Sequence, residues 1–133
     1  MAVMFERVVP VRWRDSDGFG HVNNAVFLTY LEEGRDAFYA QTFDTEPYYV
    51  LARLEVDFRA EVRHQDRQVT VRIQAERMGT TSLITRETIL TAAGTVAAEA
   101  RVVTVRWDPG QHRPVPFSER ERTWLTAAMD DDR

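Results

Sequence analysis

The stretch Asp15-Ser16-Asp17-Gly18-Phe19-Gly20-His21-Val22-Asn23-Asn24 runs without a break into an apolar helical segment, residues 25–39. A helix start presents backbone N–H groups that lack intrahelical partners, together with the positive end of the helix dipole. A carbonyl placed there would be polarised toward an oxyanion. The stretch therefore predicts a strand-to-helix junction that carries an acyl-transfer site.

Four residues of this junction are candidates for the chemistry. Asp17 could serve as a base or as a nucleophile, and His21 could orient water or assist proton transfer. The backbone N–H groups near Asn23 and Asn24 could hold the developing oxyanion. Asp, Asn and Gly also gather at ordinary strand-to-helix turns for reasons of backbone geometry, so a purely structural turn is the alternative.

Metal sites fit this sequence poorly. The acidic and glycine positions agree in part with a calcium loop, but Phe19 occupies the fifth position and Val26 stands where the bidentate Glu belongs. The histidines, His21, His64 and His112, are far apart in the sequence, there is no cysteine, and no spacing matches a zinc site. We therefore expect no metal.

Four segments share their pattern with a known family: Val11-Arg12-Trp13-Arg14-Asp15-Ser16-Asp17, Gly20-His21-Val22-Asn23-Asn24, Tyr30-Leu31-Glu32-Glu33-Gly34-Arg35 and Gly79-Thr80-Thr81-Ser82-Leu83. They resemble the hotdog-fold thioesterases of the 4-hydroxybenzoyl-CoA thioesterase and acyl-CoA thioester hydrolase group. The second string also resembles acyl-carrier-protein thioesterases, in which the corresponding His has been given a catalytic role. By this resemblance Asp17 matches the catalytic carboxylate, the backbone N–H of Asn24 matches the oxyanion donor, and His21 inherits a catalytic role.

The chain departs from these families at three positions. Some hotdog thioesterases have a His where Asn24 stands, and the acyl-carrier-protein enzymes have an Asn where Phe19 stands. Several relatives have an Arg at the position of Thr80, near the nucleotide of coenzyme A. The candidate substrate-binding residues are Asn23 at the helix start and Arg77, Thr81 and Ser82 near the later turn. Among these, Arg77 could replace the Arg that relatives have at the position of Thr80.

Length and composition predict one small domain spanning residues 1–133. The formal net charge of −4 argues against general affinity for nucleic acid or for acidic membranes. All 17 basic residues are arginine, a side chain suited to binding phosphate in a bidentate fork, although the same usage could reflect genome composition. The lack of cysteine leaves a carboxylate as the candidate covalent nucleophile.

No secretory leader is apparent at the N-terminus, and no apolar run approaches the roughly 20 residues that span a bilayer. We therefore expect a cytoplasmic protein. Neither a metal nor a redox cofactor is implied, so we expect no cofactor.

Apolar periodicity predicts the remaining elements. The helix begins near Asn23 or Asn24 and carries apolar residues on more than one narrow stripe, which predicts burial on several sides. Gly34 costs about 1 kcal/mol of helix propensity, and a close approach to a sheet would explain it. Strands are expected near residues 3–13, 50–62, 69–75, 82–91 and 96–107, a turn at 64–67, a short helix within 117–129, and a frayed acidic tail at 130–132. In the last strand the apolar register moves between Val102 and Val103, which predicts a β-bulge there.

This order of elements indicates an α+β fold, an antiparallel sheet packed on one helix. The resemblance makes it a hotdog fold: a five-stranded antiparallel sheet wrapped around one long helix, with a short C-terminal helix. It also implies a homodimer or homotetramer whose active sites lie between subunits, where the helix start of one meets strands of the other.

The function that these expectations favour is hydrolysis of an acyl-CoA to a free acid and coenzyme A. Three alternatives stay open: an acyl-carrier-protein thioesterase, an enoyl-CoA hydratase in which Asp17 and His21 imitate the Asp–His pair of hydratases, and an acyl-CoA-binding module without turnover. The identity of the acyl group cannot be inferred from these residues.

Overall fold

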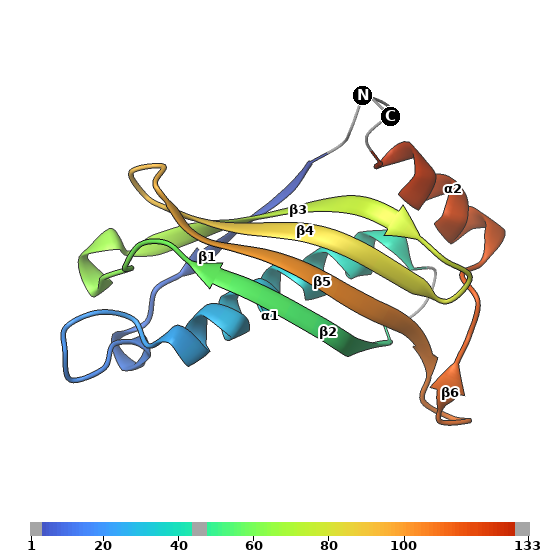
Figure 1. The fold of residues 1–133 in the computed structure, drawn as a ribbon, viewed down its shortest axis with the longest axis horizontal. Helices are drawn as coiled ribbons and strands as arrows, with labels where there is room; N and C mark the ends of the chain where they lie inside the picture. The colour runs from blue at the N-terminus through green and yellow to red at the C-terminus, as the bar shows by residue number, and fades with distance from the viewer. Residues whose placement is uncertain (1–3, 44–47, 130–133) are drawn as a thin grey trace.

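A computed structural model describes residues 4–43 and 48–129, which form a curved antiparallel sheet around a long helix (Figure 1). The elements in chain order are β1 (Phe5–Pro10), η1 (Trp13–Asp15), α1 (Asn24–Thr42), β2 (Tyr49–Phe58), η2 (His64–Asp66), β3 (Gln68–Met78), β4 (Ser82–Thr91), β5 (Val96–Asp108), β6 (Arg113–Pro114) and α2 (Glu119–Ala127). The strand order is β1-β3-β4-β5-β2, and the two-residue β6 pairs with β5. The predicted α+β hotdog fold with five main strands, one long helix and a short C-terminal helix is confirmed.

Helix α1 lies against β1, β3 and β4 with a single buried stripe. The buried residues follow a spacing of three and four, which is one face of a helix: Phe27, Tyr30, Leu31, Gly34, Arg35, Phe38, Tyr39 and Thr42. The expectation that α1 is buried on several sides is wrong, because its other apolar residues are not enclosed. Leu28, for example, is 39% exposed.

Gly34 marks the closest approach of α1 to the sheet. A Cβ atom added at Gly34 would lie 2.5 Å from Val71 Cγ1 on β3, far inside van der Waals contact. The predicted reason for a glycine in this helix, close packing on a sheet, is therefore confirmed. The contact sets how closely α1 packs on β3.

Strand β5 keeps one register where a bulge was expected. Val102, Val103 and Thr104 pair in unbroken succession with Thr85, Ile84 and Leu83 of β4, so the predicted bulge between Val102 and Val103 is wrong. The apolar pattern wrongly suggests a bulge because the next residue on the core-facing side of β5 after Val102 is Thr104, which is polar. Thr104 is buried, and its hydroxyl hydrogen bonds to the hydroxyl of Tyr39. The register shifts in the pairings of β5 lie between Leu51 and Arg53 of β2 and between Ile89 and Leu90 of β4.

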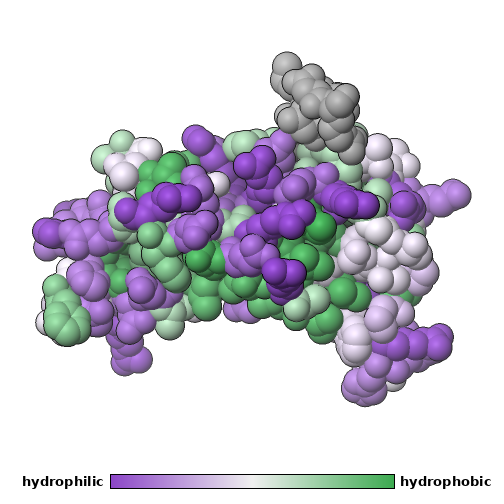
Figure 2. Space-filling model, viewed as in Figure 1, coloured by the Kyte–Doolittle hydropathy of each residue, from purple (hydrophilic) through white to green (hydrophobic). Residues whose placement is uncertain are grey.

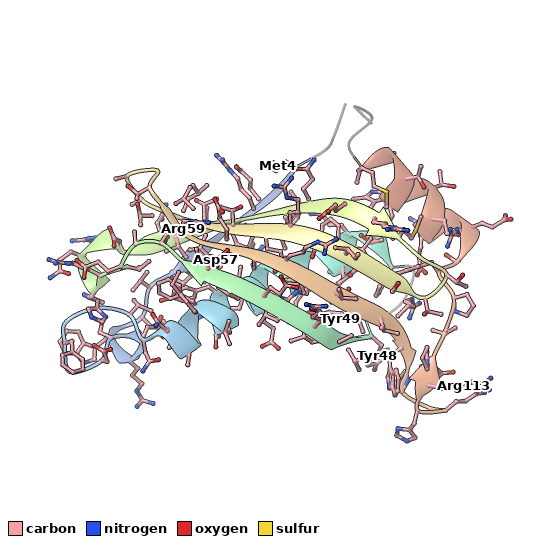
Figure 3. The ribbon with its side chains drawn as sticks, in the orientation of Figure 1. Met4, Tyr48, Tyr49, Asp57, Arg59 and Arg113 are labelled. Atoms are coloured by element: carbon pink, nitrogen blue, oxygen red, sulfur yellow. The ribbon has the colours of Figure 1, made fainter. Side chains whose placement is uncertain are left out.

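Strand β2 forms one edge of the sheet and ends earlier than expected. The predicted strand 50–62 stops at Phe58, where the N–H groups of Arg59 and Ala60 both turn to the carbonyl of Ala97. Figure 3 places Tyr48 and Tyr49 near its start and Asp57 and Arg59 near its end. Apolar residues are exposed along this strand: Val50 at 36%, Leu51 at 48% and Phe58 at 47%. Figure 2 shows apolar patches between polar side chains on the face where β2 and β5 lie.

The remaining predictions, for the chain ends and for the turn at residues 64–67, have mixed outcomes. Trp13 lies in η1 rather than in the first strand, and β6 was not predicted. The turn at residues 64–67 and the helix within 117–129 are confirmed as η2 and α2. Val3, at the predicted start of the first strand, and the acidic tail lie outside the described residues. Among the described residues, no helix is long and apolar enough to span a membrane.

Candidate active site

Asp17 lies in a tight hairpin that leads into α1. The Asp17 N–H donates to the His21 carbonyl over 2.9 Å, and Ser16 and Val22 form an isolated β-bridge one step further on. Gly20, whose φ is +86°, closes the turn in a backbone conformation that side chains disfavour. Asp17 Oδ1 accepts the N–H of Phe19 over 2.9 Å. One carboxylate oxygen is therefore fixed by the loop, while the side chain is still 22% exposed and can meet a ligand.

The start of α1 leaves its first amide, that of Asn24, without an acceptor among the described residues. Asn23 is the N-cap, as predicted for one of the two asparagines, and its side-chain oxygen accepts the Ala25 N–H over 2.8 Å. The Asn23 carbonyl accepts the Val26 N–H over 2.9 Å. Among the described residues, the N–H of Asn24 has no acceptor. The first amide of the helix is thus the donor that an incoming oxyanion would find unoccupied.

The His21 imidazole lies beside the Asp17 carboxylate without a hydrogen bond to it. Its Nδ1 is 3.7 Å from Asp17 Oδ2, a distance at which a protonated imidazole would form an ion pair. The ring stacks on Phe19, with 6.2 Å between ring centroids and 18° between planes. Because the imidazole is 38% exposed, it is accessible to water and to substrate. This arrangement fits an auxiliary role for His21 in proton transfer or water orientation.

A pocket of about 460 Å³ opens beside Asp17. It is lined by Trp13, Arg14, Ser16, Asp17, Gly20, His64 and Gln65. Within the described part of the chain, the Oγ atom of Ser16 is buried and has no hydrogen-bond partner. His64 and Gln65 were not expected at the site. They come from η2, which is close because the Val22 N–H donates to the Val62 carbonyl over 2.7 Å, a long-range contact without a local sequence signal.

The candidate residues for coenzyme A lie at the far end of the sheet. The turn at His64–Asp66 precedes β3, whereas Arg77, Thr81 and Ser82 lie near the turn that follows it. Strand β3 lies between these two turns, and its 11 residues span about 35 Å. The far turn is held by the C-terminal part of the chain: Arg122 of α2 donates to the Gly79 carbonyl, and the Arg106 N–H donates to the Thr81 carbonyl. Within one chain the structure therefore does not bring Arg77, Thr81 or Ser82 to Asp17 (Figure 1).

The Tyr30 side chain is buried behind the hairpin, and its hydroxyl is neutral. Its hydroxyl donates to Asp15 Oδ2 over 2.7 Å. Burial, and then the hydrogen bond to the Asp15 carboxylate, raise the pKa of Tyr30 well above its ordinary value. Tyr30 is therefore a permanent hydrogen-bond donor at neutral pH.

Several solved structures of other proteins are similar to this chain. A structure of a predicted thioesterase from Bacillus stearothermophilus is 30% identical over 96% of this chain and 97% of its own, with a TM-score of 0.84. A thioesterase from Thermus thermophilus, complexed with coenzyme A and Zn, is 34% identical over 92% of both chains, with a TM-score of 0.82. A 1,4-dihydroxy-2-naphthoyl-CoA thioesterase from Synechocystis is 17% identical over 93% of this chain and 96% of its own, with a TM-score of 0.80, a likeness of fold alone.

A comparison with curated proteins found no match to this chain. The family model described as the thioesterase-like superfamily matches residues 11–125, which include the hairpin, the helix and the whole sheet apart from β1. The chain therefore belongs to the thioesterase-like superfamily.

Proposed function

We propose that this protein hydrolyses an acyl-CoA thioester to a free carboxylic acid and coenzyme A. The observation that carries the proposal is the hairpin that joins the partly exposed Asp17 carboxylate to a helix start whose Asn24 N–H has no acceptor among the described residues. The Thermus thermophilus relative, complexed with coenzyme A, supports coenzyme A as the thiol.

Asp17 supplies the reacting carboxylate in this proposal. As a general base it takes a proton from water while the water oxygen adds to the thioester carbonyl. As a nucleophile its own oxygen adds and forms a mixed anhydride, which water then hydrolyses. In both routes the Asn24 N–H stabilises the tetrahedral oxyanion, an effect worth about 3 kcal/mol for one well-placed donor. The carbon–sulfur bond then breaks, and the sulfur leaves as a thiolate, which needs no strong general acid because the pKa of the thiol is about 8.5 by analogy with cysteine. The thiolate then takes up a proton, in the general-base route the one that Asp17 removed from water.

We further propose that the working unit is a homodimer or homotetramer. The edge of β2 presents unpaired backbone groups beside exposed Val50, Leu51 and Phe58, a surface that a second copy would cover. A second copy could also bring its Arg77, Thr81 and Ser82 toward the Asp17 pocket, which one chain cannot do. Sedimentation of Leu51→Arg tests this: the charge at the edge should shift the protein toward monomer, and an unchanged oligomer would rule out β2 as the interface.

The activity assay distinguishes the proposed reaction from its alternatives. Thiol release is followed with aliphatic and aromatic acyl-CoAs and with acyl-carrier-protein thioesters, and loss of enoyl absorbance is followed in parallel with an enoyl-CoA. Thiol release from acyl-CoA is the expected result. Loss of enoyl absorbance without thiol release would indicate a hydratase, and acyl-CoA binding without either change would indicate a binding module.

The expected cytoplasmic location stays a prediction, which fractionation of cells that express the chain would test.

A further inference from the structure

Asp15, two residues before the proposed catalytic carboxylate, is buried, and one of its carboxylate oxygens accepts two hydrogen bonds from the protein. It is 8% exposed, and its Oδ2 accepts the Arg12 N–H over 2.8 Å and the Tyr30 hydroxyl over 2.7 Å. Tyr30 is 0% exposed on the sheet-facing stripe of α1. A carboxylate removed from water is costly unless it is hydrogen bonded, so these two donors explain why Asp15 is tolerated there. Asp15 does not line the pocket beside Asp17, which excludes it from direct contact with a substrate in that pocket.

Asp15 also holds the backbone of the hairpin. Its carbonyl accepts the Asn23 N–H over 3.0 Å, the Ser16–Val22 bridge follows, and the Asp17 N–H donates to the His21 carbonyl over 2.9 Å. These pairings form a short antiparallel ladder. One strand of the ladder ends at Asp17, and the other passes through Asn23 into α1. The separation between the Asp17 carboxylate and the Asn24 N–H therefore depends on this ladder keeping its place relative to the helix.

The Tyr30 hydroxyl is what ties the ladder to the body of α1. Tyr30 lies seven residues after the N-cap Asn23, about two helical turns into the helix. Arg12, whose N–H also donates to Asp15, adds an outer connection to the same helix because its guanidinium donates to both carboxylate oxygens of Glu33, over 3.2 and 2.8 Å. The base of the hairpin is thus attached to α1 at a buried point and at an exposed one.

We propose that Asp15 and Tyr30 form a positioning pair that sets the Asp17 carboxylate against the free amide at the start of α1. The pair acts through Asp17 and touches no substrate, so the inference rests on the proposed function for its effect on turnover. A catalytic group displaced by about 1 Å can lose about 100-fold in rate while substrate binding is kept. Loss of the pair should accordingly lower kcat and leave KM nearly unchanged.

The first test is Tyr30→Phe, which removes the hydroxyl and keeps the buried ring. We expect kcat to fall between about 10- and 100-fold, with KM within about twofold of the wild-type value. Asp15→Ala, which removes both accepting interactions, should give at least the same loss. Asp15→Asn keeps an oxygen that can accept both bonds and should restore most of the turnover.

Tyr39→Phe is the matched control, because Tyr39 is buried on the same stripe of α1 and its hydroxyl bonds to Thr104 of β5 instead of to the hairpin. It should leave kcat unchanged. An equal fall of kcat in Tyr30→Phe and Tyr39→Phe would assign the effect to general loss of core hydrogen bonds and would overturn the proposal. So would unchanged kcat in Tyr30→Phe, or a rise in KM that accounts for the whole loss.

Amide hydrogen exchange gives a readout that does not depend on thioester hydrolysis. The Asp17 and Asn23 amides form the two ends of the ladder, and they should exchange faster in Tyr30→Phe and in Asp15→Ala than in the wild type or in Tyr39→Phe. Unchanged exchange at both amides would refute the positioning pair even if activity fell. If the wild type hydrolysed no thioester, the proposed function would fail, and the exchange rates would still decide whether Asp15 and Tyr30 hold the hairpin.

Discussion

The buried ion pair between α1 and β4 offers a test of how the helix is held on the sheet. Arg35 Nε and Nη2 donate to the two carboxylate oxygens of Glu87 over 3.1 and 2.9 Å, and the Thr85 hydroxyl donates to the same carboxylate over 2.7 Å. The side chains of Arg35 and Glu87 are 4% and 0% exposed. Burial lowers the pKa of the Arg35 guanidinium, but the Glu87 carboxylate outweighs it and raises that pKa above its ordinary value.

Glu87→Gln removes the negative charge and leaves the Arg35 cation in the core. Removal of one partner of a buried ion pair costs about 3–5 kcal/mol. At about 4 °C per kcal/mol for a domain of this size, Tm should fall by about 12–20 °C. Arginine stays protonated throughout the neutral range, in the variant as in the wild type. In the wild type the folded pKa of Arg35 is raised above its unfolded value, so the stability that the pair contributes is lost only as pH rises through that folded pKa. The loss should therefore be nearly the same from about pH 6 to pH 9.

Urea and thermal unfolding followed by circular dichroism measure this loss. The matched control is Glu33→Gln, which breaks the bidentate pair between Glu33 and Arg12 on the same helix. That pair is 36% and 46% exposed, and exposed pairs contribute about 0–1 kcal/mol. A loss below about 1 kcal/mol for Glu87→Gln, or equal losses for the two variants, would refute the reasoning from burial.

Three further predictions concern the helix packing and the candidate site. Gly34→Ala should destabilise by about 1–3 kcal/mol in urea unfolding despite better helix propensity, because its Cβ meets Val71, and adding Val71→Ala should recover part of the loss. Arg77→Ala should raise KM for acyl-CoA and flatten the salt dependence of that KM, because exposed phosphate contacts are screened by salt. Turnover of a short thioester that lacks the nucleotide should be unchanged. Equal effects on both substrates would remove Arg77 from the binding site. His21→Gln should lower turnover with an unchanged Tm if His21 takes part in the chemistry, whereas parallel losses would indicate a structural role.

Local patterns account for what the sequence predicts well. The cap at Asn23, the helix that follows it and the tight approach at Gly34 each depend on residues a few positions apart or on the steric size of one residue. The predicted strand-to-helix turn that presents Asp17 is likewise local, because it is closed between Asp17 and His21; the short ladder that closes it was not predicted.

Other features could not be predicted because their partners are distant in the sequence. Thr104 is polar, so it breaks the apolar alternation of β5, and only Tyr39, 65 positions away, explains its burial. Arg35 and Glu87 are 52 positions apart and would each be expected at the surface. His64 reaches the Asp17 pocket through the fold, whereas Arg77 is carried to the opposite end of the sheet by the length of β3.

The rate of thiol release by Asp17→Asn tests the proposed function most directly. The matched control is Asp108→Asn, because Asp108 makes the same turn in a different loop: its Oδ1 accepts the Gly110 N–H over 2.9 Å, as Asp17 Oδ1 accepts the Phe19 N–H over 2.9 Å. We expect Asp17→Asn to lose at least about 100-fold in kcat on the best acyl-CoA, with its fold intact by circular dichroism, and Asp108→Asn to keep wild-type turnover. Retention of more than about half of the wild-type rate by Asp17→Asn, or an equal loss in Asp108→Asn, would contradict the assignment of Asp17 as the reacting carboxylate.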